Sequence, residues 1–104
     1  MSITVLLEVQ FRSDVPADTV EAAIRETLAQ TRAFDGCESL EVLVDDADPT
    51  RMVVVEAWTS GAAHDAYEAW RATPDGAAAI GPIVAAPPVA RTFARTIART
   101  IAIS

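Results

Sequence analysis

The stretch of sequence that decides the fold reads Met52-Val-Val-Val-Glu56-Ala-Trp58-Thr-Ser60-Gly-Ala-Ala-His64-Asp-Ala-Tyr67-Glu-Ala-Trp70. Its first part is an apolar run rich in β-branched residues, which indicates a buried β-strand. A helical pattern starts at once after Ser60, whose hydroxyl suits the N-cap position of a helix. A strand ending in a carboxylate and an indole, followed by a helix with a histidine and two large aromatic residues, can form the wall of a pocket.

The rest of the chain has simple periodicity on both sides of this stretch. Strict alternation over residues 3–11 and 39–44 predicts strands, and an apolar stripe at helical spacing after Pro16 predicts a helix that ends near Ala33. Asp35-Gly36 is expected to form the turn after that helix. The strand at residues 51–59 is apolar on both faces, so we expect it to be buried on both sides. We expect the second helix to end at Thr73-Pro74, with one short helical turn around residues 77–80.

The C-terminal segment is ambiguous. Residues 91–102 repeat an arginine every four positions, and this period by itself favours a helix. The order of elements favours a strand to about Phe93, because β-α-β-β-α lacks only a final strand to complete a ferredoxin-like antiparallel sheet. We therefore expect a strand first and leave the residues past Ile97 open. The fold class is α+β, with one domain over residues 1–104 and a C-terminal extension from about residue 95.

Composition argues against several kinds of partner. The 104 residues carry a net charge of -7, which opposes binding to nucleic acid. No apolar run approaches the length of a membrane span, and the N-terminus does not have the pattern of a signal peptide. The lone cysteine, Cys37, fits a reducing cytoplasm and a buried structural thiol. One histidine without a second thiol does not make a metal site, so we expect no metal.

Several short patterns along the chain occur in a fixed order. Gly36 opens the second strand, Asp48-Pro49 divides a hairpin, and Glu56-x-Trp58 closes the third strand. Ala63 follows five places after Trp58, Tyr67 four places later, and Thr73-Pro74 ends the helix. In these residues and their spacing the chain resembles the antibiotic biosynthesis monooxygenase (ABM) domains. The resemblance covers roughly residues 3–93 and implies a ferredoxin-like monomer that pairs sheet to sheet as a dimeric α/β barrel.

The resemblance also implies an activity. Relatives oxygenate small aromatic, quinol or polyketide-like substrates with molecular oxygen and without a cofactor, so we expect a cytoplasmic homodimeric monooxygenase of this kind. Many relatives carry histidine at the position of Tyr67, whereas the only histidine of this chain is His64. A non-catalytic dimeric binding or accessory module of the same fold is the alternative. Relatives that degrade haem use an asparagine on the first strand, and this chain has no asparagine.

Six residues are the candidates for the site, which we expect as an apolar pocket between the sheet and the second helix. His64, Tyr67 and Glu56 are the catalytic candidates, because proton transfer needs a histidine, phenol or carboxyl group near the substrate. Each also has a structural interpretation: His64 as a boundary residue, Tyr67 as core and Glu56 as a buried hydrogen-bond partner. Trp58, Trp70 and Val54 are the substrate-binding candidates, and Trp58 could equally fill the core.

Overall fold

The computed structural model describes residues 2–94, and these form one antiparallel sheet with two helices. The predicted β-α-β-β-α-β order is confirmed, and the C-terminal extension predicted from about residue 95 lies outside the described residues. The elements are β1 (Ile3–Gln10), α1 (Ala17–Ala33), β2 (Cys37–Val44), β3 (Arg51–Trp58), α2 (Gly61–Arg71) and β4 (Val89–Phe93).

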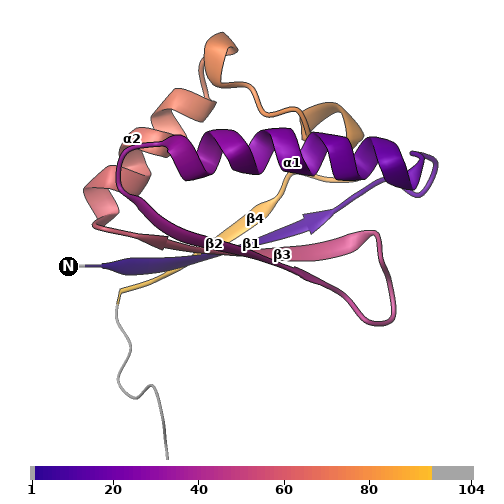
Figure 1. Ribbon diagram of the computed structural model, residues 1–104, viewed down its shortest axis with the longest axis horizontal. Helices are drawn as coiled ribbons and strands as arrows, with labels where there is room; N and C mark the ends of the chain where they lie inside the picture. Colours follow the sequence, from indigo (N-terminus) through magenta and orange to yellow (C-terminus); the bar gives the residue numbers. More distant parts are fainter. Residues whose placement is uncertain (1, 95–104) are drawn as a thin grey trace, which may run out of the picture.

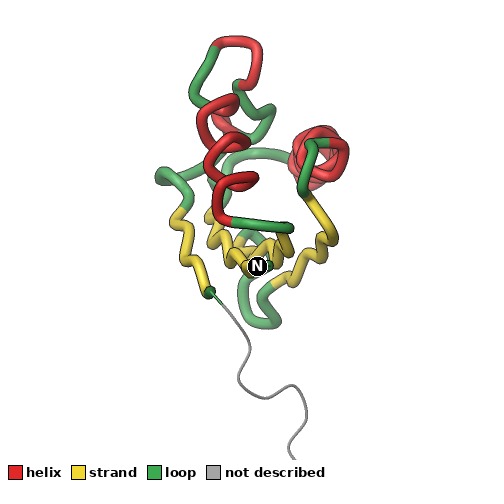
Figure 2. Tube along the Cα trace, turned by 90° about the vertical axis from the view of Figure 1, so that its left-hand side faces the viewer, coloured by secondary structure: helices red, strands yellow, loops and turns green. Residues whose placement is uncertain are grey.

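The strands lie in the order β2-β3-β1-β4, and each neighbouring pair is antiparallel. This order, with the first and third strands in the middle, is the ferredoxin-like arrangement that the sequence predicts. Both helices cover the same face of the sheet, with α1 running lengthwise over it and α2 beside one end (Figure 1, Figure 2). The opposite face carries no helix within the described chain.

Local chemistry accounts for where the helices begin and turn. Ser60 is the N-cap of α2, as predicted, and its Oγ accepts a hydrogen bond from the backbone N–H of Ala63 at 3.1 Å. Pro16 precedes the first residue of α1, where its fixed φ is compatible with the helix. Gly36 has a φ of +97°, a conformation that favours glycine, and it turns the chain from α1 into β2.

The helix-facing side of the sheet forms the core in two parts. Val9 of β1 packs with Val20 and Ile24 of α1 and with Ile80. Val5 of β1 packs with a second cluster around Trp58, at the end of the sheet nearest to α2. The first cluster joins α1 to the sheet, whereas the second joins α2 to it.

The open face of the sheet is apolar along its centre. Leu6 of β1 pairs with Val55 of β3 on this face, and Val55 also pairs with Glu41 of β2. Val53 and Val55 are half-buried, so the expectation that β3 is buried on both sides is wrong within a single chain, because both helices cover the other face. Leu43, Val89 and Phe93 are exposed at the two edges of the sheet.

Two segments refine the predictions. The short helical turn predicted at residues 77–80 does not form there; 3-10 turns lie on either side of it, at Pro74–Gly76 and Gly81–Ile83, where prolines start them. Residues 89–93 form the predicted final strand rather than a helix, because pairing with β1 satisfies their backbone groups. The prediction for residues 95–102 lies outside the described part of the chain.

Candidate functional site

The third strand brings two of the predicted site residues into direct contact. Glu56 and Trp58 point to the same side of β3, and the indole Nε1 of Trp58 donates a hydrogen bond to Oε1 of Glu56 at 2.9 Å. Both side chains are buried, at 3% and 0% exposure. Burial raises the pKa of Glu56, while the hydrogen bond from Trp58 and the nearby His64 act in the opposite direction. A carboxyl group in this environment holds its proton more readily than one in water.

Helix α2 adds His64, Tyr67 and Trp70 to this pair. The ring of Trp58 lies 5.4 Å from that of His64 and 5.0 Å from that of Tyr67, measured between centroids. The ring of Phe34, from the end of α1, completes the group, at 5.3 Å from Tyr67 and 5.6 Å from Trp70. We call these five rings, with Glu56, the aromatic cluster. Phe34 was not among the predicted residues. It lies two residues before Gly36, in the turn that follows α1, and its ring faces those of α2.

The hydroxyl of Tyr67 is held by groups that are remote in sequence. It lies 2.7 Å from Oγ1 of Thr31, and it accepts a hydrogen bond from Nε of Arg71 at 2.7 Å. Thr31 donates its own proton to the carbonyl of Thr27, so the proton between Thr31 and Tyr67 comes from the phenol. The hydroxyl of Tyr67 therefore already donates one hydrogen bond, to Thr31, and accepts another, from Arg71. Thr31 continues the helical spacing of Val20, Ile24 and Thr27, so the sequence could have placed it on the buried face of α1. Its contact with Tyr67 depends on how α1 and α2 pack, which no local pattern shows.

His64 is buried, with 7% exposure, and stands at the edge of the cluster. Its Nε2 lies 3.3 Å from Oε1 of Glu68, one turn later on α2, but the two atoms do not have hydrogen-bond geometry. A protonated His64 would form an ion pair with Glu68 across this gap. This arrangement places the buried imidazole of His64 next to a carboxylate that reaches solvent.

An apolar cavity lies beneath α1 rather than beneath α2. It has a volume of about 830 Å³ and opens between α1 and the edge strand β2. None of the six predicted site residues lines it, because the space between the sheet and α2 is filled by the aromatic cluster. Its floor and walls are mainly apolar and come from both helix and sheet: Val15, Ala17, Val20, Ile24, Leu28, Ala29, Leu40, Val42, Val44, Pro49 and Met52.

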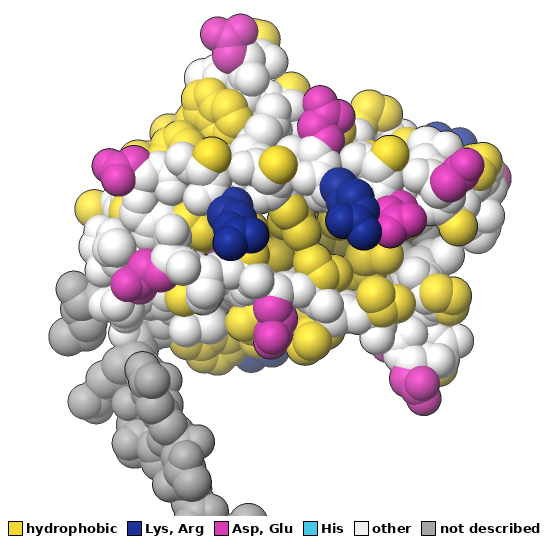
Figure 3. Space-filling model, viewed as in Figure 1, with side chains coloured by type: hydrophobic (Ala, Val, Ile, Leu, Met, Phe, Trp, Pro, Cys, Tyr) yellow, Lys and Arg dark blue, Asp and Glu magenta, His cyan; other side chains and the backbone are white. Residues whose placement is uncertain are grey.

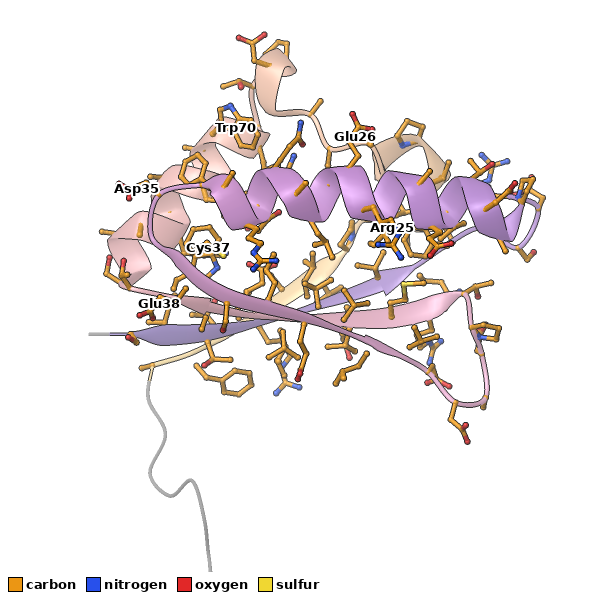
Figure 4. The ribbon with its side chains drawn as sticks, in the orientation of Figure 1. Arg25, Glu26, Asp35, Cys37, Glu38 and Trp70 are labelled. Carbon is orange, nitrogen blue, oxygen red and sulfur yellow. The ribbon has the colours of Figure 1, made fainter. Side chains whose placement is uncertain are left out.

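Charged side chains stand around the opening of this cavity. Arg25, Arg32 and Glu21 of α1 line it. Glu41 of β2 also belongs to the lining, but it pairs with Val55, so its side chain lies on the open face of the sheet. Figure 3 shows the hollow as an apolar floor with a basic side chain on either side of it. Figure 4 labels Arg25, which extends from α1 toward the sheet. The cavity thus combines an apolar interior with a rim that carries two arginines and the carboxylate of Glu21.

Two further properties concern metals and membranes. Within residues 2–94, no group of three or more histidine, cysteine, aspartate or glutamate side chains is arranged to hold a metal ion. Over the same range, neither helix is long and apolar enough to cross a bilayer.

Comparison with known proteins places the chain in a family. The family model for antibiotic biosynthesis monooxygenases matches residues 2–81, and the chain belongs to this family. A search of curated proteins finds no significant match.

Solved structures share the fold over nearly the whole chain. Rv0793 from Mycobacterium tuberculosis has a TM-score of 0.74 at 20% identity, and the match covers 96% of this chain and 100% of the chain of Rv0793. A structure described as an antibiotic biosynthesis monooxygenase has a TM-score of 0.74 at 21% identity, covering 90% and 98%. PA3566 from Pseudomonas aeruginosa has a TM-score of 0.71 at 17% identity, covering 91% and 94%. At these identities the likeness establishes the fold.

Proposed function

We propose that this domain is a cofactor-independent monooxygenase that oxidises a small aromatic, quinol or polyketide-like substrate with molecular oxygen. The observation that carries the proposal is the apolar cavity beneath α1, whose volume of about 830 Å³ lies within the usual range of ligand sites. The family to which the chain belongs supports the reaction type.

The reaction needs little from the protein. An electron-rich phenolate or carbanion can itself reduce oxygen, so the protein must only deprotonate the substrate, orient it and shield it from water. With an anthrone, the ring methylene becomes a carbonyl: one oxygen atom enters the product and the other leaves as water with the two methylene hydrogens. The substrate supplies all the electrons.

The six candidate residues take their roles from their position beside the cavity. Met52 lines the cavity, and Val54 and Glu56 follow it on the same face of β3, at about 7 Å for every two residues. Under this proposal Val54, Trp58 and Trp70 form the wall behind the bound substrate. Under the same proposal His64, or Tyr67 with Glu56, receives the substrate proton.

Oxygen uptake tests the proposal directly. Metal-free protein is mixed with anthrone and labelled oxygen, and the product is examined for one labelled atom while dissolved oxygen is followed. Val42→Phe fills the cavity and should abolish uptake, whereas Ala69→Phe, on the exposed side of α2, should leave it unchanged. His64→Gln should lower the rate by about tenfold or more if His64 handles the proton.

A non-catalytic binding module is the second candidate, and one observation favours it. The Tyr67 hydroxyl is bonded to Thr31 and Arg71, and Glu56 is bonded to Trp58, so two of the three catalytic candidates are occupied by protein partners. Binding of the aromatic compound without oxygen uptake above the uncatalysed rate would select this candidate.

We further propose that the chain forms a homodimer through the open face of the sheet. Leu6, Val53 and Val55 are the apolar residues at the centre of this face, and Val89 and Phe93 of β4 are exposed at its edge. Arg91 pairs with Leu6 and Glu8 pairs with Val53, so charged side chains of both signs border this apolar centre. An exposed apolar surface bordered by polar residues marks an interaction site, and a second copy presents the same surface.

A further inference from the structure

Two of the arginines stand on one side of α1 in the wall of the apolar cavity. Arg25 and Arg32 are seven residues apart, so they lie on nearly the same face of the helix, about 10 Å apart along its axis. The chain as a whole has 15 acidic and 8 basic residues. The rim of the cavity carries these two arginines and one carboxylate, that of Glu21, so its net charge is opposite in sign to that of the whole protein (Figure 3).

The two arginines differ in what they already bind. Arg25 forms an ion pair with Glu21 at 3.0 Å, and both of these side chains are largely exposed. Arg32 takes part in no ion pair or side-chain hydrogen bond with the other residues between 2 and 94. The guanidinium of Arg32 is thus available to a ligand, whereas that of Arg25 is shared with a carboxylate.

The two ends of the cavity differ in chemistry: one end is charged and the other is apolar. Arg32 is at the C-terminal end of α1, and Leu40 lines the cavity near the start of β2, which follows α1 after a tight turn. Val20 and Met52 line the other end, where the first core cluster begins. A ligand that placed a charged group at Arg32 would lay its apolar body toward Ile24, Val20 and Met52.

We propose that the cavity selects an anionic ligand: a planar or elongated apolar molecule with a carboxylate that is bound by Arg32, with Arg25 as a second, weaker contact. The inference rests on the proposed function only in assigning the substrate to this cavity, and it adds the class of substrate. A guanidinium presents parallel N–H donors that match the two oxygens of a carboxylate. Arg32 is exposed, so water screens this contact and its contribution is modest. A neutral ligand of the same shape gains the apolar contacts alone.

Binding of two matched probes tests the inference without any turnover. 2-Naphthoate and the neutral 2-naphthalenemethanol have the same ring system, and their affinities are measured by calorimetry. We expect the unaltered protein to prefer the carboxylate. Arg32→Gln should weaken binding of 2-naphthoate about three- to tenfold and leave that of the alcohol unchanged, which is the range for a charge-assisted contact at a partly exposed site.

Three further variants make the test specific. Arg25→Gln should weaken binding of 2-naphthoate less than Arg32→Gln does. Glu21→Gln releases Arg25 from its ion pair and should strengthen binding of the carboxylate. Arg12→Gln removes a charge that is paired with Asp14 outside the cavity and should change nothing. The midpoint of thermal unfolding of each variant shows whether the loss of Arg32, which also lies in the last turn of α1, alters the fold.

The outcomes separate this inference from the proposed function. Failure of 2-naphthoate to bind, equal affinity for the two probes, or equal losses for both in Arg32→Gln would overturn the anionic ligand. If anthrone is oxidised but Arg32 has no effect on 2-naphthoate, the monooxygenase stands and the inference fails. If Arg32 determines binding of 2-naphthoate but no substrate consumes oxygen, the inference stands and the monooxygenase fails.

Discussion

The indole nitrogen of Trp58 donates to the carboxyl group of Glu56 at 2.9 Å, between two side chains of the same strand that are both buried. Trp58 and Glu56 are two residues apart on one face of β3, so the N–H of the indole and the oxygen of the carboxyl group form a hydrogen bond inside an otherwise apolar core. An indole N–H and a carboxylate are both costly to bury alone. The pair therefore stabilises the region where β3 meets α2, whatever further part Glu56 takes in chemistry.

Breaking this pair from the tryptophan side should be strongly destabilising. Trp58→Phe keeps an aromatic ring but leaves the carboxyl group without its donor, and we expect a loss of about 2–4 kcal/mol in the free energy of unfolding. A double-mutant cycle with Glu56→Met, measured by urea denaturation, should give a coupling of about 1–3 kcal/mol. Trp70→Phe is the control, because Trp70 is half-buried and not bonded to Glu56. Coupling near zero would mean that the two side chains act independently.

The stability of Glu56→Gln should depend on pH differently from that of the unaltered protein. Burial raises the pKa of Glu56 above its ordinary value of 4.5, so the folded state binds the proton more tightly than the unfolded state. Its contribution is fully present below the unfolded pKa and is lost as the pH rises through the folded pKa. Glutamine does not ionise and still offers an oxygen to Trp58.

We therefore expect Glu56→Gln to gain stability relative to the unaltered protein as the pH rises above the ordinary pKa of 4.5, measured as the difference in unfolding free energy at each pH. The carboxyl groups of Asp14 and Asp48, whose pKa values are lowered by hydrogen bonds from Arg12 and Thr50, are present in both proteins and cancel from the difference. If the difference in unfolding free energy between the two proteins does not change with pH, then Glu56 has the same pKa in the folded and the unfolded state.

Arg71 should be important for joining the two helices. Its guanidinium donates to the carbonyl of Thr27 at 2.9 Å, to Oε1 of Gln30 at 2.8 Å and to the hydroxyl of Tyr67 at 2.7 Å. Arg71→Met leaves these acceptors without their donor, and we expect a loss of about 2–4 kcal/mol by chemical denaturation. The exposed pair of Arg12 with Asp14 provides the control: Arg12→Met should leave stability nearly unchanged. Similar losses in both variants would argue against a special role for Arg71.

Glycine substitutions should separate required positions from tolerant ones. A Cβ on Gly76 would lie 1.9 Å from the carbonyl oxygen of Trp70, and one on Gly36 would lie 2.5 Å from Cβ of Ala63 at a φ of +97°. We expect Gly76→Ala and Gly36→Ala each to lower the midpoint of thermal unfolding by several degrees. Gly61→Ala meets no atom within 4 Å at the start of α2, so it should be neutral or stabilising.

The proposed homodimer can be broken at the centre of the open face. Val55→Glu places a charge between Leu6 and Glu41 on this face, and we expect it to convert a dimer into a monomer at micromolar protein in analytical ultracentrifugation. Ala66→Glu, on the exposed side of α2, adds the same charge elsewhere and should leave the dimer intact. A monomer without any substitution would refute the proposal.

The local pattern of the sequence was sufficient for the fold. Alternation in β1 and β3, the hydroxyl of Ser60 and the turn at Gly36 act over a few residues, so they can be recognised from the chain alone. The same alternation placed Glu56 and Trp58 on one face of one strand, and helical spacing brought Tyr67 and Trp70 to one side of α2. The order of the elements then left one arrangement of the sheet, and β4 completed it as far as Phe93.

Tertiary structure alone decided how this framework is filled. Tyr67 meets Thr31 across 36 residues, and Arg71 meets Gln30 across 41, because those distances depend on how α1 and α2 pack and not on any local period. The same packing fills the space beneath α2 with Phe34, Trp58 and the rings of that helix. Beneath α1, small residues such as Ala17 and Ala29 face an edge strand, and the volume that they leave unfilled is the cavity. Periodicity gives the face of each side chain, but only the packing of two elements determines whether the space between them is occupied or empty.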